Sequence, residues 1–547
     1  MNKVALKIKN IIADTCFGEM GRPTGIYWSK DRRILAIASS LDWLQWSGRD
    51  LNTKLKFHHR VGLYDAATCQ LIGVFDKLKY PVNHIDFHPE ESLIAIATGA
   101  YDGGYCFEGE LLLWDFENDR SYKPLRENRE VSTCQFSRDG RQLYFVLRPP
   151  CEEDEEGNSL EETFYTYASQ QYFESLFLES IKEITMREAG ISEAYTIQNE
   201  AHITEILSQL ALENALAYEK RWHVWDVCML KDNAILATSA INYLEHWSVD
   251  GRLQLAIPAQ EKARAVEILE LPETDSYLIN VEQRSINPIQ SNTVGYQWHM
   301  KTHELKEWIK RDYPLSVSAN KDLDLLAREV FRFPKDKNKT LDFIIHADGS
   351  LSSDLNLGHY DLINHYLRIK DAPHLYFIQG TPASSHEQKW ICQLTAANQQ
   401  YERLFPLEWD TKRKAHMFSD GGCYCEDSQG QALILAVRFY APNPSALPKD
   451  HALVMRRKLP HGEVLWKQGF DSQITSILWI EEYNLILLAL TQGKLCILSA
   501  DEGQLLSVEE VKIHGVQSVI MSMSYHHNNL VAGTIDGRII CYELTWN

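Results

Sequence analysis

The sequence predicts an all-β protein that is built from repeated antiparallel sheets of four short strands. The chain has 547 residues, more than one hydrophobic core needs, which favours several domains or an array of repeats. Short apolar runs bounded by turn residues recur along its length, as strands do in such arrays. The chain also contains 14 Trp and 25 Tyr, residues that are enriched in packed β-sheets.

The clearest repeat unit covers residues 84–116. Its first strand ends at Phe87 and is followed by a turn with a proline. A second strand over Leu93–Thr98 carries small alanine residues, which let neighbouring sheets approach closely. After a glycine-rich loop, a third strand closes on Trp114 and Asp115. The sequence therefore predicts a compact unit of strands that packs against similar units on both sides.

This unit resembles a WD40 repeat, in which a small-residue strand is followed by a strand ending in Trp-Asp. The resemblance covers most of the chain and is strongest over residues 20–146, 222–250 and 472–544, whereas residues 310–470 depart from the pattern. It implies a β-propeller with four-stranded blades. Because the family consists mainly of rigid scaffolds that hold protein partners, the resemblance also implies a noncatalytic function.

Ten units can be recognised in series, which exceeds the usual 4–8 blades of one ring. We therefore expect about 8–10 repeat units in one large ring or in two rings, with a helical insertion. One residue near the end of each first strand marks the units: Trp28, Phe87, Phe136, Met229, Leu271, Ala319, Ile369, Phe418, Trp479 and Tyr525. The longest step, from Phe136 to Met229, predicts an insertion or a missed unit.

Three regions follow from this pattern: the first blades over 1–150, an acidic and helical insertion over 151–220, and the remaining blades over 221–547. Within the insertion we expect helices over about Gln170–Glu188 and Glu200–Arg221. The second has apolar residues at three-to-four spacing on one face. That face either packs back onto the protein's own sheets or docks a partner.

The two ends of the chain are predicted to meet in one sheet. The last unit ends after its third strand, and Val4–Lys9 alternates apolar and basic residues as a half-exposed strand does. We expect this N-terminal strand to complete the last sheet, because closure removes open sheet edges.

The composition argues against several classes of partner. The formal net charge is −20, from 55 Lys+Arg and 75 Asp+Glu, which disfavours nucleic acids and anionic membranes and suits a basic protein partner. No apolar segment is long enough for a transmembrane helix, and no signal sequence is evident. The 11 cysteines are scattered, as expected for reduced thiols in a cytoplasmic protein.

No motif in the sequence argues for catalysis. There is no Gly-x-Ser-x-Gly elbow, phosphate-binding loop or HExxH helix. Cys423 and Cys425 could form half of a metal site, but no second pair at zinc-ligand spacing follows. We therefore expect no catalytic residues, no cofactor and no metal. A propeller enzyme, a hydrolase or lyase with an axial active site drawn from several blades, stays open as the alternative.

The candidate binding residues lie in long connections between second and third strands, which emerge on one face of a propeller. These aromatics either pack beneath their own loops or form a surface that binds a partner. The candidates are Trp43, Trp46, Arg49, Tyr101, Asp102, Tyr105, Phe107, Arg284, Phe439 and Tyr440.

The functional hypothesis is a noncatalytic scaffold or adaptor. One form of it captures and neutralises another protein, as an immunity factor does. A further alternative is a subunit of a larger assembly, with residues 151–220 as its docking arm.

Overall fold

A computed structural model gives the fold of the chain. It describes residues 4–41, 59–101, 107–151, 161–189, 198–260, 263–271, 275–284, 291–312, 315–320, 322, 324–329, 342–346, 350–355, 357, 374–379, 390–406, 416–426, 430–440 and 452–546.

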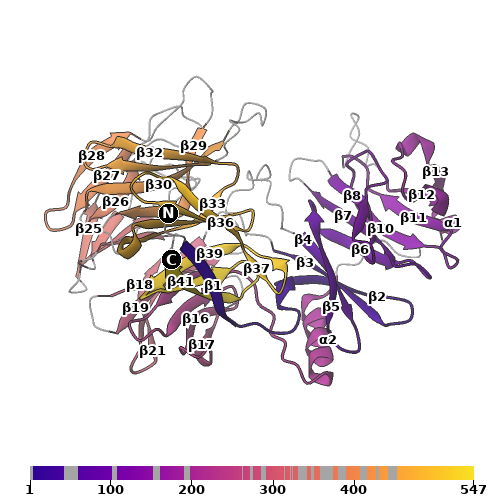
Figure 1. Cartoon of the computed structure of the whole chain (residues 1–547), viewed down its shortest axis with the longest axis horizontal. Helices are drawn as coiled ribbons and strands as arrows, with labels where there is room; N and C mark the ends of the chain where they lie inside the picture. The colour runs from indigo at the N-terminus through magenta and orange to yellow at the C-terminus, as the bar shows by residue number, and fades with distance from the viewer. Residues whose placement is uncertain are drawn as a thin grey trace. The chain divides into compact units, whose positions relative to one another are not determined.

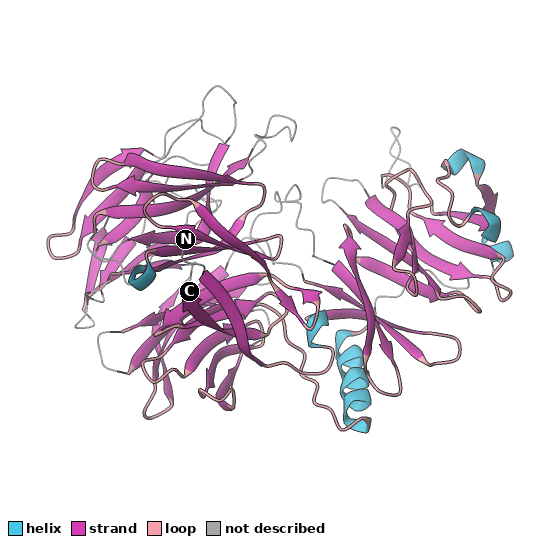
Figure 2. Cartoon of the chain, viewed as in Figure 1, coloured by secondary structure: helices cyan, strands magenta, loops and turns pink. Residues whose placement is uncertain are grey.

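The described chain is mostly β-structure, with ten antiparallel sheets of three or four strands and one two-stranded hairpin (Figures 1 and 2). It divides into two compact units. The main unit comprises Met1–Ala13 and Trp222–Asn547, and the inserted unit comprises Asp14–Arg221. The chain thus starts in the main unit, leaves it after one strand, and returns to it at Trp222.

The inserted unit contains three four-stranded sheets, in each of which consecutive strands pair. Their strands are β2 Pro23–Trp28, β3 Ile34–Ser40, β4 His59–Asp65 and β5 Leu71–Leu78; β6 Val82–Phe87, β7 Leu93–Tyr101, β8 Phe107–Asp115 and β9 Arg120–Tyr122; and β10 Val131–Phe136, β11 Gln142–Leu147, β12 Thr163–Ala168 and β13 Lys182–Ile184.

The main unit contains seven sheets with the same consecutive order, and the last of them also includes the N-terminal strand. Their strands are β14 Val224–Met229, β15 Ile235–Ser239, β16 Asn242–Trp247 and β17 Leu253–Pro258; β18 Ala263–Glu270, β19 Ser276–Arg284, β20 Ser291–His299 and β21 Glu304–Arg311; β22 Leu315–Ala319, β23 Leu325–Glu329, β24 Asp342–Ile345 and β25 Leu351–Leu355; β26 Leu375–Gln379, β27 Trp390–Thr395 and β28 Gln400–Pro406; β29 His416–Glu426, β30 Ala432–Tyr440, β31 Ala452–Lys458 and β32 Glu463–Phe470; β33 Ile474–Ile480, β34 Leu485–Leu490, β35 Lys494–Ser499 and β36 Leu505–Glu510; and β39 Ile520–His526, β40 Asn529–Thr534, β41 Ile539–Trp546 and β1 Val4–Ile12. A hairpin of β37 (Lys512–Ile513) and β38 (Val516–Gln517) precedes β39.

The two chain ends meet in the last sheet of the main unit. Strand β1 pairs with β41 in an antiparallel register that runs from Val4 opposite Trp546 to Ile12 opposite Ile539 (Figure 1). It therefore occupies the edge position for which the sequence analysis expects an N-terminal strand. Leu6 packs on the hydrophobic cluster between this sheet and the preceding one, whereas Ile12 lies in the cluster shared with β14.

Neighbouring sheets of the main unit share hydrophobic clusters. The clusters join β14–β17 with β18–β21, β18–β21 with β22–β25, β22–β25 with β26–β28, β26–β28 with β29–β32, β29–β32 with β33–β36, and β33–β36 with the last sheet. The last sheet also packs on the first, because Val531 and Ile539 share a cluster with Val224 and Val227. Every sheet of the main unit therefore has two neighbours.

The first strands of several sheets are joined directly by side-chain hydrogen bonds. The Ser522 hydroxyl on β39 donates to Asp226 Oδ1 on β14 at 2.7 Å, and the Ile268 N–H on β18 donates to Asp226 Oδ2 at 2.8 Å. On the other side of β39, the Thr475 hydroxyl on β33 donates to the Ile520 carbonyl at 2.5 Å. Strands β33, β39, β14 and β18 thus follow one another in contact.

The three sheets of the inserted unit stack in the same manner. One hydrophobic cluster joins β2–β5 with β6–β9, and another joins β6–β9 with β10–β13. Their first strands are also linked, because Tyr27 donates to the Asn83 carbonyl at 3.1 Å and the Asn83 amide donates to the Val131 carbonyl at 2.9 Å. The Phe136 N–H donates to Asp86 Oδ2 at 2.6 Å, as the Ile268 N–H does to Asp226.

Helix α2 (Glu200–Glu213) covers the outer side of the first of these sheets. It is capped by Asn199, and its buried residues Ile203, Leu207 and Ala211 lie on its inward face. The first two share a cluster with core residues of β2–β5. Just before the helix, the Gln198 side-chain amide accepts from the Ile26 N–H and donates to the Ile26 carbonyl, each at 3.0 Å. The apolar face of α2 therefore packs on the protein's own sheet, the first of the two expectations for it.

The prediction of a helix over Gln170–Glu188 is wrong. This segment contains two 3-10 turns, Ser169–Gln171 and Leu178–Ser180, then strand β13 and the single turn α1 (Met186–Ala189). Ile184 pairs with Phe164 of β12, so the end of the segment follows strand alternation. Part of the expected insertion over 151–220 therefore supplies β12 and β13, the third and fourth strands of a sheet. The acidic run over Glu152–Glu156 lies outside the described residues.

Nine of the ten residues used to mark repeat units lie in or directly beside the first strand of a sheet. Leu271 immediately follows β18, and Ile369 lies outside the described residues. The sheets β22–β25, β26–β28 and β29–β32 occupy the region that departs from the repeat pattern.

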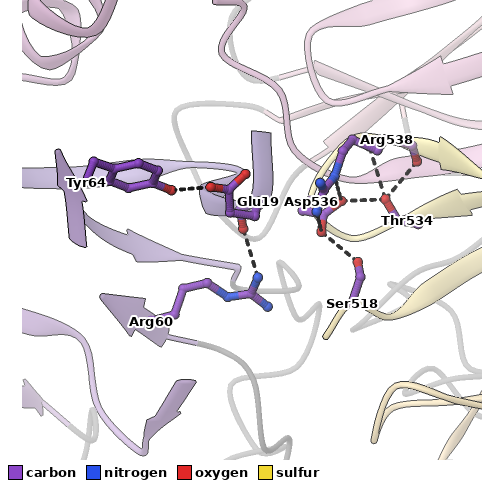
Figure 3. Close-up of polar contacts among 7 residues, drawn as sticks. All are labelled: Glu19, Arg60, Tyr64, Ser518, Thr534, Asp536 and Arg538. Atoms are coloured by element: carbon purple, nitrogen blue, oxygen red, sulfur yellow. Dashed lines mark hydrogen bonds and ion pairs between the residues drawn. The ribbon is translucent and has the colours of Figure 1, made fainter. Parts of the chain in front are cut away.

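Buried charges in both units are held by short-range partners (Figure 3). In the main unit, Asp536 accepts from Arg538 at 2.9 Å and from the Ser518 hydroxyl at 2.7 Å, at the turn between β40 and β41. In the inserted unit, the buried Arg60 donates to the Glu19 carbonyl at 2.8 Å, and Tyr64 donates to the Glu19 carboxylate at 2.5 Å. These partners offset part of the cost of removing the charged groups from water.

Candidate functional site

The four connections that carry the candidate residues all join the second and third strands of a sheet. They lie between β3 and β4, β7 and β8, β19 and β20, and β30 and β31. In a consecutive antiparallel sheet, every such connection emerges at the same end of its sheet. We refer to this end as the second–third end.

Half of the ten candidates lie outside the described residues. They are Trp43, Trp46, Arg49, Asp102 and Tyr105.

Backbone positions are given for four other candidates. Tyr101 ends β7, Arg284 ends β19, and Phe439 and Tyr440 end β30, so all four stand where a strand enters its connection. Phe107, the first residue of β8, is the candidate whose side-chain contacts the structure gives.

Phe107 is held at the second–third end by Arg148. The guanidinium carbon of Arg148, which follows β11 in the neighbouring sheet, lies 5.2 Å from the centre of the Phe107 ring. The Phe107 N–H also donates to the carbonyl of Pro150 at 3.2 Å. Stacking of arginine on an aromatic face fixes both side chains and is common at binding surfaces.

Two glycines opposite one another make room for Glu130 beside this pair. Gly99 on β7 lies opposite Gly109 on β8. A Cβ atom at Gly99 would lie 2.1 Å from Glu130 Cγ, and one at Gly109 would lie 2.7 Å from Glu130 Cα. The glycines recognised in the loop after Thr98 therefore serve close packing of Glu130 on the hairpin.

Glu130 is nearly buried but remains paired. Asn83 donates to its carboxylate at 3.1 Å, and Arg148 Nε lies 3.9 Å from it. Removal from water raises the pKa of Glu130, and the nearby Arg148 and Asn83 oppose that rise. Arg148 also lies 3.6 Å from Glu162. Arg148 thus connects two carboxylates with the ring of Phe107.

A second ionic group lies on the same hairpin. Glu110 on β8 is almost inaccessible to water and has Lys123 at 2.9 Å and Lys79 at 3.4 Å. Next to it, the Tyr80 hydroxyl donates to Glu108 at 2.9 Å. Burial and this carboxylate raise the pKa of Tyr80 above its usual range.

Three carboxylates around Phe107 are paired with cations. Glu110, Glu130 and Glu162 are each within ion-pair distance of a cation, so they do not form a free acid–base couple. Among the described residues, no group of three or more His, Cys, Asp or Glu side chains could hold a metal ion. The rigid charged network instead fixes the place from which the connection between β7 and β8 emerges.

Glu130 and Arg148 are parts of this site that sequence reasoning missed. Both lie in the neighbouring sheet, so their contact with Phe107 depends on how two sheets pack. The available signal is the glycine pair Gly99 and Gly109, because glycine inside a strand pattern often marks close approach by another group.

Comparison with known proteins gives no family for this chain. No model of a known protein family matches it, and no curated protein matches its sequence. In the part of the chain that the structure describes, none of the helices has the length and apolar character needed to cross a membrane.

Proposed function

We propose that the chain is a noncatalytic scaffold or adaptor that binds another protein in the cytoplasm through the second–third ends of its sheets. The main unit would be a seven-bladed WD40-like β-propeller, and the inserted unit would add three further blades.

The packing of the sheets supports the propeller. Seven sheets each share a hydrophobic cluster with two neighbours, and the last sheet shares one with the first. Because the chain is consecutive within each sheet, such a series with its ends in contact is what a closed ring requires. The hydrogen bonds of Asp226 to Ser522 and Ile268 place first strands next to one another, as around an axis.

One observation carries the binding function: the stack of Phe107 on Arg148, whose guanidinium also lies 3.9 Å from the Glu130 carboxylate. It presents an aromatic ring and an arginine, two residue types that dominate binding energy in protein interfaces, on a fixed base. The ion pairs around it leave little scope for acid–base catalysis. The net charge of −20 favours a basic partner by long-range attraction. Capture and neutralisation of such a partner, as by an immunity factor, is the form of this function that we favour.

The experiment is affinity purification of the tagged full chain from cells that naturally express it, with mass spectrometry of the co-eluting proteins. We expect one basic protein in a fixed ratio to the chain. A double variant, Phe107→Ala with Arg148→Gln, should reduce its recovery about tenfold or more, because it removes the stacked pair.

Ile72→Ala is the matched control, since Ile72 is a half-exposed apolar residue of the same unit on β5. It should retain the partner. Absence of any protein in a fixed ratio to the wild-type chain would contradict the scaffold function. Full recovery by a correctly folded double variant would contradict the role of the second–third end.

A further inference from the structure

The segment between β12 and β13 presents two phenylalanines to solvent. Phe173 and Phe177 are each 52% exposed, whereas Tyr172 and Leu176 beside them are buried in the cluster between the second and third sheets. Tyr172 and Leu176, four positions apart, anchor the segment in the core. Phe173 and Phe177, also four positions apart, project from it. This is the segment that the sequence analysis expects to be a helix.

The backbone of this segment is fixed along the chain that follows β9. Leu176 forms an isolated parallel bridge with Leu125. The Leu176 N–H donates to the Pro124 carbonyl at 2.7 Å, and the Arg126 N–H donates to the Leu176 carbonyl at 3.2 Å. The Leu178 N–H donates to the Glu127 carboxylate at 3.2 Å. The exposed rings therefore project from an ordered base.

Each exposed ring is also held by a neighbour. The centre of the Phe173 ring lies 4.4 Å from that of Tyr122, with 54° between the ring planes. The guanidinium carbon of Arg126 lies 4.0 Å from the centre of the Phe177 ring, and Arg126 Nε donates to the Ser175 hydroxyl at 3.2 Å. We call these four residues, Tyr122, Arg126, Phe173 and Phe177, the aromatic–arginine surface.

An isolated exposed apolar residue is common on protein surfaces and needs no explanation. Here the exposed rings belong to two ordered pairs, Phe173 with Tyr122 and Phe177 with Arg126. Aromatic and arginine side chains are enriched in protein interfaces. Their fixed positions also lower the entropy lost when a partner binds.

The charge of Arg126 indicates what the partner carries. Among the residues that the structure describes, Arg126 has no carboxylate within ion-pair distance, and its two terminal nitrogens have no hydrogen-bond acceptor. The planar group stacked on Phe177 is therefore available to a carboxylate, which arginine can bind through two parallel hydrogen bonds.

We propose that the aromatic–arginine surface binds a short apolar peptide segment that carries a carboxylate, with the apolar side chains on Phe173 and Phe177 and the carboxylate on Arg126. This inference rests on the proposed scaffold function and names a second contact for a protein partner. The site lies on a different part of the inserted unit's sequence from Phe107, so the two can be tested separately.

The experiment selects binders to the full chain from a phage-displayed library of random short peptides. We expect enrichment of Asp or Glu next to Leu, Phe or Trp. A synthetic peptide with the enriched sequence should bind to the double variant Phe173→Ser with Phe177→Ser at least about tenfold more weakly than to the wild-type chain. Leu212→Ser is the matched control, since Leu212 is a 70% exposed apolar residue of the same unit, and should leave binding unchanged.

A second comparison tests the arginine without removing the rings. On the wild-type chain, the peptide should bind more tightly than its Glu→Gln analogue. On Arg126→Gln, the two peptides should bind equally. The proposal is overturned if no apolar, acidic peptide is enriched, if the phenylalanine variant binds the peptide as the wild type does, or if Arg126→Gln keeps the preference for Glu. A natural partner captured equally by the folded phenylalanine variant would overturn this surface and leave the scaffold function standing.

Discussion

Asp86 and Asp139 are carboxylates of the inserted unit in opposite surroundings. Asp86 lies between two sheets, where removal from water raises its pKa, although the Phe136 N–H partly opposes that rise. Asp139 lies exposed at a turn, where hydrogen bonds from Ser137 and the Arg141 N–H lower its pKa. The two groups should therefore affect the pH dependence of stability with opposite signs.

Asp86→Asn should raise the melting temperature at neutral pH. The folded state holds the Asp86 proton more tightly than the unfolded state, whose pKa is about 3.9. The stability contributed by this group is thus present below pH ~3.9 and is lost as the pH rises through the raised pKa. Asparagine avoids that loss and keeps an acceptor for Phe136. Melting curves from acidic to neutral pH should show that the melting temperature of the variant exceeds that of the wild type by an amount that grows with pH. A variant that melts below the wild type at neutral pH would contradict this effect of Asp86.

Asp139→Asn should show the opposite trend. The stability contributed by the ionised carboxylate is present above its unfolded pKa of about 3.9 and is lost as the pH falls through the lowered pKa of the folded state. The variant should melt below the wild type at neutral pH, and the difference should disappear in acid. An equal difference at all pH values would argue against an effect of the charge.

Gly99 tests the close packing at the candidate site. The Cβ of Gly99→Ala would lie 2.1 Å from Glu130 Cγ, so the hairpin or Glu130 must move. We expect a loss of about 1–3 kcal/mol in the free energy of unfolding, as for other overpacked positions. Gly73→Ala is the control, because its Cβ would meet Trp114 at an ordinary 3.5 Å. Chemical denaturation of both variants measures this loss. A Gly99→Ala variant as stable as the Gly73→Ala control would refute the close packing.

Individual residues of the site could be predicted only where the signal is local. The aromatic at position 107 and the glycines at 99 and 109 stand out in the sequence beside a strand. Arg148 and Glu130 do not, because nothing local marks which charged residue of the next sheet will reach the hairpin.

At the scale of elements, strand β1 joins positions that are more than five hundred residues apart in the sequence, such as Lys7 and Glu543.

Removing residues 1–12 should lower the melting temperature of the full chain by many degrees, because it uncovers the edge of β41 and removes Ile12 from a buried cluster. Ile12→Ala alone should cost about 2–4 kcal/mol. Ile8→Ala, at a 39% exposed position on the same strand, is the matched control. A truncated chain with an unchanged melting curve would show that β1 does not stabilise the sheet.

Elements could be predicted where the apolar pattern had a single explanation. Alternation in Val4–Lys9 and the small-residue strands gave correct strand positions. The segment around Phe173 was harder, because Tyr172 and Leu176 are buried at a spacing of four and Phe173 and Phe177 are exposed at the same spacing. This spacing resembles a helix, although the chain follows another backbone path. The amide of Gln198 on Ile26 is also invisible in the sequence, since it joins residues 172 positions apart.

At the scale of the whole molecule, the chain is organised as one unit placed within another. The sequence predicts about 8–10 repeat units, and the described residues contain ten sheets of three or four strands. Their division into two units could not be predicted, because each repeat looks alike whichever neighbour it packs on. The division between the units falls after Ala13 and before Trp222, between β1 and β14. The residues that pack the first sheet of the main unit on its last sheet, such as Val224 and Val531, are more than three hundred positions apart and share no local motif.

The most direct test of the closed seven-sheet arrangement is an electron cryo-microscopy map of the full chain. We expect seven sheets around one axis in the main unit, with Ser522 on β39 beside Asp226 on β14. A map in which the main unit is an open stack, with β39 and β14 separated, would contradict it.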